Sequence, residues 1–358
     1  MKCILVAVFS LCIVFFSNAL YAQQEPKGED HVTEEKFDPA KEIMGHIQDA
    51  YEFHFFTFGD FHATIHLPVL LYSSQRGFSA FSSSKFGHDG TEEYDGYKLE
   101  AGSAVPVNPE EKIFDFSLTK NVVQMFIALI VLVLLMTGIA RKYKSGKGVL
   151  SAPTGWQNAI EPVITFVRDD VAKIYLGKRY ERYMPYLLTI FFFILINNIF
   201  GLIPGSANVT GNVAFTIVLG VISFIVILAS SNKHFWGHIF NPHVPWGIKP
   251  ILVPVELLGV FTKPFALIVR LFANMVAGHI IILSFVSLIF IFGGMNKAAG
   301  WGFSPISVLF TVFIYLIEIM VAFIQAFIFT NLTAVFIGQA FEGSDHDADG
   351  HDDGIIAS

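Results

Sequence analysis

The chain alternates between long apolar runs and shorter polar segments, and the length of each run indicates what it forms. A helix needs about 20 consecutive apolar residues to cross about 30 Å of hydrocarbon. Five runs after the N-terminal one approach or exceed this length. We therefore predict five membrane-embedded helices, which cover residues 116–140, 185–204, 213–230, 254–292 and 306–341.

Residues 156–183 carry a different pattern, because apolar residues recur every three or four positions and charged residues lie between them. The first of these apolar residues is Ile160, and the last three are Val171, Ile174 and Tyr175. This periodicity predicts an amphipathic helix along the membrane surface. Basic residues crowd the stretch just before it, which places this side in the cytoplasm by the positive-inside rule.

The N-terminal apolar run has the features of a secretory signal. Lys2 precedes the apolar run, and small residues such as Ala22 end it before a polar stretch. We expect residues 1–22 to be a signal peptide, with a retained signal anchor as the alternative. Both cysteines, Cys3 and Cys12, lie in this segment, so a cleaved chain has no thiol for disulfides or metal ligation.

Two polar segments flank the membrane part, residues 116–341. Residues 23–115 contain no spanning run, and we expect a periplasmic extension whose fold the pattern does not indicate. His62 and His66 have a helical ligand spacing, but glycine and proline nearby disfavour a helix, so we expect surface histidines rather than a metal site. We expect residues 342–358 to form a solvated, acidic cytoplasmic tail.

The last two runs are too long for simple spans. Residues 254–292 alone would form a helix of about 58 Å, almost twice the hydrocarbon thickness. The glycine-rich residues 293–305 separate this run from residues 306–341. We therefore predict a long, tilted antiparallel hairpin with a loop at residues 293–305.

Composition supports a membrane protein and draws attention to two charges. The chain is 53% hydrophobic and only 15% charged, whereas about a quarter of the residues in soluble domains are charged. Between Lys263 and Lys297 the one permanently charged side chain is Arg270, and between Lys297 and Glu342 it is Glu318. A charge at bilayer depth costs at least about 2.5–3.5 kcal/mol, so it normally faces protein or water. Snorkelling of Arg270 to the interface is the alternative.

The hairpin brings polar residues to matching depths. Residues at equal depth have numbers that sum to about twice the loop centre, 299. His279 and Glu318 meet this condition, as do Arg270 and Gln325. We expect His279 and Glu318 to pair and to form a site that takes up and releases a proton. Asn274 lies within about 40° of Arg270 on an ideal helix.

Three motifs carry a resemblance to a known family. PVELLGVFTKPFALIVRLFANMVAGH, IEIMVAFIQAFIFTNLTA and NNIFGLIPG resemble subunit a of F-type ATP synthases in order and spacing, over about residues 116–341. Members of that family are stators of a membrane motor that pack against a rotating ring of c subunits. Their two aqueous half-channels deliver ions to a carboxylate on each c subunit and remove them.

The resemblance assigns roles to seven residues. Arg270 matches the arginine that interacts with the ring carboxylate and separates the half-channels, and Asn274 matches its polar neighbour. His279 and Glu318 match a pair that lines the outer half-channel. The other matches are a glutamine at the depth of the arginine, a helix-end asparagine and an acidic position in the cytoplasmic half-channel: Gln325, Asn198 and Glu256. An ordinary interfacial carboxylate is the alternative at the last position.

These observations predict an all-α polytopic membrane protein with five membrane-embedded helices and one interfacial amphipathic helix. We expect a proton-carrying stator subunit that is not catalytic alone, because the chain has no GxxxxGK[ST] loop for ATP. The implied partners are the c-ring, the b subunits of the peripheral stalk, the remaining synthase subunits and membrane lipid, with no cofactor and no nucleic acid. The implied location is a bacterial inner membrane, with the extension periplasmic and the C-terminus cytoplasmic. A solitary ion transporter or channel is the alternative, and the sequence leaves proton versus sodium coupling open.

Overall fold

The structure is a computed structural model, and the part of the chain that it describes has several gaps. The described ranges are residues 49–58, 61–87, 92–100, 102–109, 111–146, 155–203, 205–240 and 247–341. The predicted signal peptide (residues 1–22) and acidic tail (residues 342–358) lie outside them.

The described part of the N-terminal extension is built from short antiparallel strands, a fold that the sequence pattern did not indicate. The strands are β1 (Glu52–Phe58), β2 (Phe61–His66), β3 (Pro68–Ser73), β4 (Gly77–Ser82), β5 (Tyr97–Glu100), β6 (Ser103–Pro106) and β7 (Ile113–Asp115). They form a β1-β2 pair, a β4-β3-β7 sheet and a β5-β6 pair. A small core of six buried side chains holds them together: Tyr51, Val69, Leu71, Phe86, Tyr97 and Ala104.

Tyr51 connects this core to the end of β7. Its hydroxyl donates a hydrogen bond to Asp115 and accepts one from the backbone N–H of Ala104 at 3.0 Å. Burial and the hydrogen bond to Asp115 raise the pKa of the Tyr51 hydroxyl, because both favour the protonated phenol.

The membrane part is helical, which confirms the predicted fold class. Its helices are α3 (Lys120–Lys144), α4 (Trp156–Phe166), α5 (Lys173–Leu176), α6 (Tyr180–Gly201), α7 (Val213–Ser230), α8 (Lys233–Phe240), α9 (Lys249–Met295) and α10 (Lys297–Phe341). Within the described residues, five helical segments are long and apolar enough to cross a membrane: Lys120–Lys144, Trp156–Gly201, Val213–Ser230, Lys249–Met295 and Lys297–Ala340.

The predicted amphipathic helix is present, but a π-helical turn, η2 (Val167–Ala172), interrupts it between α4 and α5. A π turn adds one residue and shifts the helical phase. As a result Ala172 and Leu176 are buried, whereas Ile174 and Tyr175, which we placed on the apolar face, are exposed. The sequence analysis assumed unbroken α-helical spacing and therefore did not place Ala172 and Leu176 on the side that is buried in the protein.

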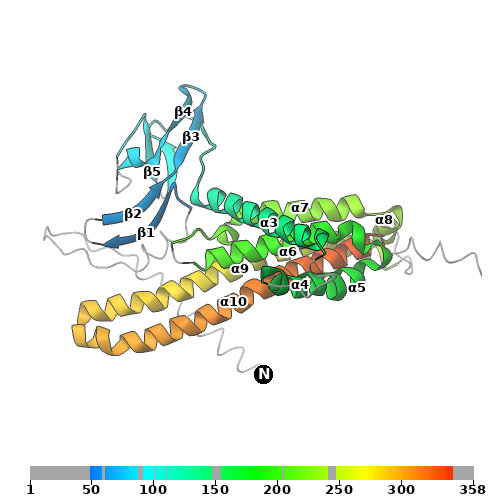
Figure 1. Cartoon of the computed structure of the whole chain (residues 1–358). Helices are drawn as coiled ribbons and strands as arrows, with labels where there is room; N and C mark the ends of the chain where they lie inside the picture. Colours follow the sequence, from blue (N-terminus) through cyan, green and yellow to red (C-terminus); the bar gives the residue numbers. More distant parts are fainter. Residues whose placement is uncertain are drawn as a thin grey trace, which may run out of the picture. The chain divides into compact units, whose positions relative to one another are not determined.

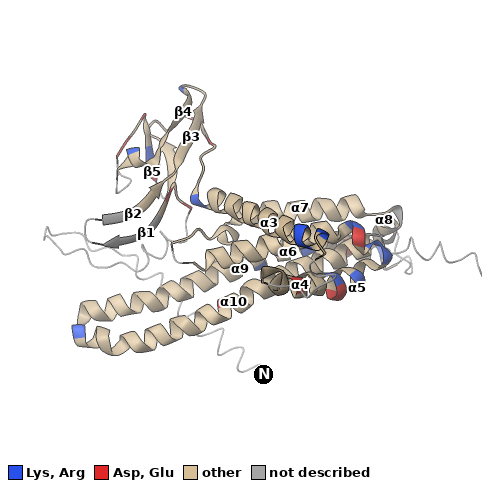
Figure 2. Ribbon diagram, viewed as in Figure 1, with Lys and Arg blue, Asp and Glu red and all other residues tan. Residues whose placement is uncertain are grey.

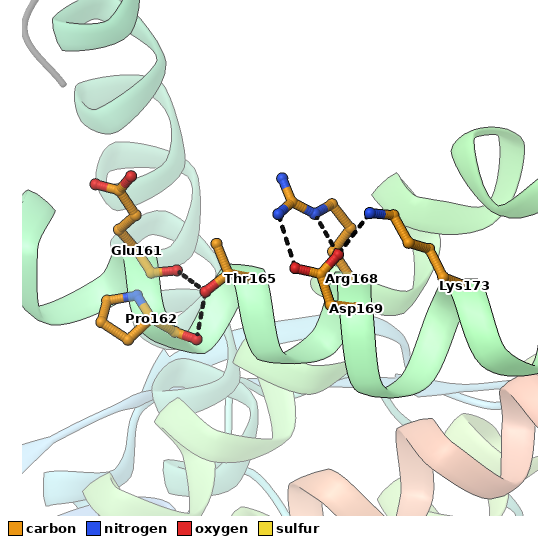
Figure 3. A network of polar contacts seen from close by, with 6 residues as sticks. All are labelled: Glu161, Pro162, Thr165, Arg168, Asp169 and Lys173. Atoms are coloured by element: carbon orange, nitrogen blue, oxygen red, sulfur yellow. Dashed lines mark hydrogen bonds and ion pairs between the residues drawn. The ribbon is translucent and has the colours of Figure 1, made fainter. Parts of the chain in front are cut away.

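Charged side chains line the exposed side of this interrupted helix (Figure 3). Asp169 accepts hydrogen bonds from Nε and Nη2 of Arg168 at 2.9 and 2.8 Å, and Nζ of Lys173 lies 2.7 Å from its Oδ1. The buried side chains of η2 and α5 pack into the main core, where α6 meets α10. Phe191 of α6 and Phe329 of α10 are almost fully buried there.

The helices α9 and α10 run antiparallel and side by side (Figure 1). They contain 47 and 45 residues, or about 70 and 67 Å of helix, more than twice the hydrocarbon thickness. The long hairpin is therefore confirmed.

The predicted loop at residues 293–305 is wrong, because only Asn296 separates the two helices. Its side chain accepts a hydrogen bond from the backbone N–H of Ala298 at 3.0 Å, which caps the start of α10. Glycine allows the arms to meet here, since a Cβ on Gly300 would lie 2.7 Å from the Cα of Gly293.

Candidate functional site

The polar residues of the hairpin interrupt two otherwise apolar helices. Figure 2 shows long stretches of α9 and α10 without charged residues. Arg270 lies on α9, where its side chain is exposed together with those of Ala273, Asn274 and Ala277. These four positions fall on one stripe of the helix because they are three or four residues apart. Three of the four side chains are small or short, so a second protein surface could approach the guanidinium closely.

Gln325 of α10 joins this stripe through Asn274. The Nδ2 of Asn274 donates a hydrogen bond to Oε1 of Gln325 at 2.9 Å, and Gln325 itself is buried. Asn274 lies one turn along α9 from Arg270. The sequence analysis placed Arg270 at the depth of Gln325, whereas the residue that contacts Gln325 is Asn274.

His279 is half-buried, and both of its ring nitrogens face polar atoms. Nε2 lies 2.8 Å from the carbonyl oxygen of Gly201, at the end of α6. Nδ1 lies 2.9 Å from the carbonyl oxygen of Met275 and 3.2 Å from Nδ2 of Asn208. A neutral ring protonated at Nε2 donates to Gly201 and accepts from Asn208, whereas a protonated ring donates to both carbonyls. Each protonation state thus has hydrogen-bond partners.

Glu318 is buried on α10 against Gly278 of α9, with 6% of its surface exposed. A Cβ at position 278 would overlap the Glu318 carboxylate. Its Oε2 has no hydrogen-bond partner among the described residues. The expected direct pair with His279 is therefore wrong. Gly278 faces α10, and the next residue is rotated by about 100° on the helix, which turns His279 toward Gly201 and Asn208.

Asn198 connects α6 to the same face of α10. It is fully buried, and its Nδ2 donates to the carbonyl oxygen of Ala322 at 3.2 Å. Ala322 lies one turn from Glu318, and Gln325 one turn further, so all three share one side of α10. The Oδ1 of Asn198 lacks a partner among the described residues, as does the Glu318 carboxylate oxygen. Buried polar atoms of this kind are commonly satisfied by water.

Glu256 lies apart from this cluster. It is half-buried on α9, fourteen residues before Arg270, or about 21 Å along the helix axis. The structure therefore places five of the seven predicted residues in one region of the hairpin, with Asn198 of α6 against it, and leaves this carboxylate outside that region. Within the described part of the chain, no group of three or more His, Cys, Asp or Glu side chains comes together to hold a metal ion.

Two residues that the sequence analysis did not single out support the histidine. Asn208 lies in the turn before α7, where its Nδ2 also lies 3.4 Å from the carbonyl oxygen of Met275. Gln124 of α3 holds that turn, because it donates to the carbonyl of Ala207 and accepts from the Ala207 N–H at 2.8 Å. The sequence features that could have identified these two residues are a lone glutamine in an apolar span and an asparagine in a glycine-rich turn.

Fold and site together define a polytopic membrane protein that carries an arginine, a histidine and a carboxylate within a long helical hairpin. Residues 122–338 match the family model described as ATP synthase A chain, and the chain belongs to this family. Residues 42–125 match a second model, described only as a domain of unknown function.

Relatives with known names agree with the family match. The chain is 42% identical to the ATP synthase subunit a of Chloroherpeton thalassium, over 88% of this chain and 81% of that one. It is 46% identical to that of Chlorobium phaeobacteroides over 66% and 70% of the two chains. The subunit a of Myxococcus xanthus is 41% identical, over 71% and 86%.

Proposed function

We propose that this chain is the stator subunit of the membrane sector of an F-type ATP synthase, with two half-channels that carry protons to and from a rotating c-ring. The observation that carries the proposal is the family match over residues 122–338, which contains the whole polar cluster and Glu256. The alternative of a solitary transporter is not favoured, because the named relatives are subunits of a synthase.

The first half-channel would bring protons to the buried carboxylate of Glu318. His279 fits a proton-accepting position, because its ring has partners in both protonation states. Beyond it, the carboxylate and the amide of Asn198 present buried oxygens suited to water. Protons would therefore pass from the turn at Asn208, past the imidazole, to water near Glu318, and then to a carboxylate of the c-ring.

Arg270 would act on the carboxylate of each c subunit in turn. A guanidinium stays charged at all accessible pH values and cannot relay a proton. At hydrogen-bond distance from a carboxylate it favours the ionised form. Its exposed stripe would thus face the ring, release the proton to the second half-channel and prevent direct flow between the half-channels. Glu256 would line that second path, on the cytoplasmic side.

The remaining assignments follow from the same role. The chain would work without catalysing a reaction alone, next to c subunits, the b subunits of the peripheral stalk and the other synthase subunits. It would lie in a bacterial inner membrane, with residues 1–22 as a signal peptide, residues 23–115 in the periplasm, residues 116–341 as the membrane domain and residues 342–358 as a cytoplasmic tail.

The Arg270→Ala variant tests the proposal in the assembled complex, reconstituted in liposomes. We expect assembly at normal yield and loss of proton-driven ATP synthesis. Lys263→Ala is the matched control, since Lys263 is an exposed base on the same helix that contacts Gln339 at 3.3 Å. The control should retain synthesis. Normal synthesis by the Arg270→Ala complex would refute the assigned role.

A further inference from the structure

The sheet β4-β3-β7 of the N-terminal extension carries large apolar side chains on both faces. On the inner face Val69 and Leu71 are fully buried in the small core, next to Ser73 and Ser79. In antiparallel sheets of this kind the opposite face is normally polar and solvated. Here the residues of the three strands that point to the opposite face include none with a charge. Six of its residues define what we call the aromatic face: Leu70, Tyr72, Phe78, Ala80, Phe114 and Phe116.

The rings of the aromatic face form a continuous ridge. Tyr72 is paired with Phe78 on one side and with Phe114 on the other, so the three side chains are direct cross-strand neighbours. Their exposed fractions are 45%, 64% and 59%. The backbone N–H of Phe116 donates to the carbonyl of Leu70 at 2.9 Å, which continues the ladder beyond β7. Phe116 is 65% exposed and extends the ridge by one more ring.

The chain ties this ridge to the start of a membrane helix. Phe116 lies four residues before Lys120, the first residue of α3, and four residues reach at most about 14 Å. The backbone N–H of Lys120 also donates to the carbonyl of Ala50 at 2.9 Å, and that of Leu118 to Pro68 at 3.4 Å. These hydrogen bonds hold the sheet close to the start of α3, a helix that is long and apolar enough to cross a membrane.

We propose that the aromatic face docks on the interfacial layer of the lipid bilayer, at the surface where α3 begins. Aromatic side chains are enriched at this layer, because their rings partition below the headgroups while a tyrosine hydroxyl stays hydrated. The uncharged, largely aromatic strand residues of this face suit lipid better than a charged protein surface, which would need complementary charges. The domain thereby lies flat on the membrane and restrains the outer end of α3.

Site-directed spin labelling of the assembled complex in liposomes tests this proposal. Cys3 and Cys12 are replaced by serine, and single nitroxides are attached after Phe78→Cys, Phe116→Cys or Val107→Cys. Val107 is an exposed residue of the same domain outside the aromatic face. The measured quantity is the collision rate with oxygen, which concentrates in lipid, relative to a water-soluble nickel chelate. We expect positions 78 and 116 to favour oxygen and position 107 to favour nickel.

Three results would overturn the proposal. A label at position 78 that is as accessible to nickel as one at position 107 would show that the sheet stands clear of the bilayer, even if position 116 is shielded. Labels at positions 78 and 116 that are shielded from both oxygen and the nickel chelate would show a protein partner. Nickel accessibility that stays unchanged after polar substitution of the aromatic face would also count against docking.

Polar substitution provides that independent readout. With the nitroxide at Ala80→Cys, the double variant Tyr72→Ser with Phe114→Ser should raise nickel accessibility at least to the level of an exposed loop. The matched double variant Ile65→Ser with Val107→Ser removes similarly exposed apolar side chains from elsewhere in the domain, and should leave nickel accessibility unchanged.

Discussion

Replacement of Gly278 by alanine should displace the Glu318 carboxylate while the hairpin keeps most of its stability. The added Cβ would lie closer than the 3.0 Å that real Cβ contacts respect. Restoring an ordinary separation of about 3.5 Å would require the carboxylate to retreat by more than about 1 Å. The group that must move is the far end of a flexible side chain rather than backbone, so the helices can keep their packing.

The expected energies point to a functional defect. Overpacking typically costs about 1–3 kcal/mol, whereas alanine in place of glycine favours a helix by about 1 kcal/mol. The net change in the free energy of unfolding should therefore lie between about 0 and 2 kcal/mol. If the carboxylate must recover its native position for each proton transfer, an overlap cost of about 1.4 kcal/mol already slows the flux about tenfold.

The assay is proton flux through the membrane sector in liposomes, together with the thermal stability of the complex. Gly259→Ala is the control, because a Cβ there meets nothing within 4 Å. Combining Gly278→Ala with Glu318→Asp, which shortens the side chain by one methylene, should restore part of the flux. Full flux in the Gly278→Ala complex would refute the link between this contact and proton transfer.

Three further predictions concern the surroundings of the site and the extension. Asn208→Ala removes a partner of His279 and should reduce ATP-driven acidification of liposomes while assembly persists; unchanged acidification would contradict this. Gln124→Leu leaves both backbone groups of Ala207 unpaired, at about 1–3 kcal/mol per group, and should lower the Tm; an unchanged Tm would contradict this. The raised pKa of Tyr51 stabilises the extension below the ordinary tyrosine pKa of about 10, and this stability is lost as pH rises above that value. Protease resistance of the strands should therefore fall from about pH 9 to about pH 11 in the native chain and not in Tyr51→Phe; equal profiles would contradict this.

The features that could be predicted from the sequence are those set by long-range patterns along one helix. The lengths of the two apolar arms gave the hairpin, and the positions of polar residues gave their approximate depth, although Gln325 contacts Asn274, one turn from the predicted Arg270. Both depend on helical rise alone. The family motifs led to the same region and are confirmed by the family match.

Features that depend on the rotation of residues around a helix axis, or on tertiary contacts, could not be predicted from the sequence. Depth alone cannot show that Gly278, rather than His279, faces Glu318, because adjacent residues on a helix differ by about 100°. The partners of the histidine come from the end of α6 and the turn at Asn208, far away in sequence. The β strands were hidden because exposed aromatic side chains occupy the outer face of the β4-β3-β7 sheet, which weakens the alternation that normally reveals a strand. Glycine and proline led us to expect a loop where α9 and α10 almost meet.

The single residue between α9 and α10 fixes how the arms align over their whole length. Only Asn296 lies outside the two helices, so the connection cannot absorb an insertion. One residue added near the start of α10 would therefore rotate the rest of α10 by about 100° and shift it by about 1.5 Å along its axis. Glu318 would then lose its close contact with Gly278, although it lies 22 residues after Asn296. The length of the connection between α9 and α10 therefore fixes the relative positions of Gly278 and Glu318 as much as the residues themselves do.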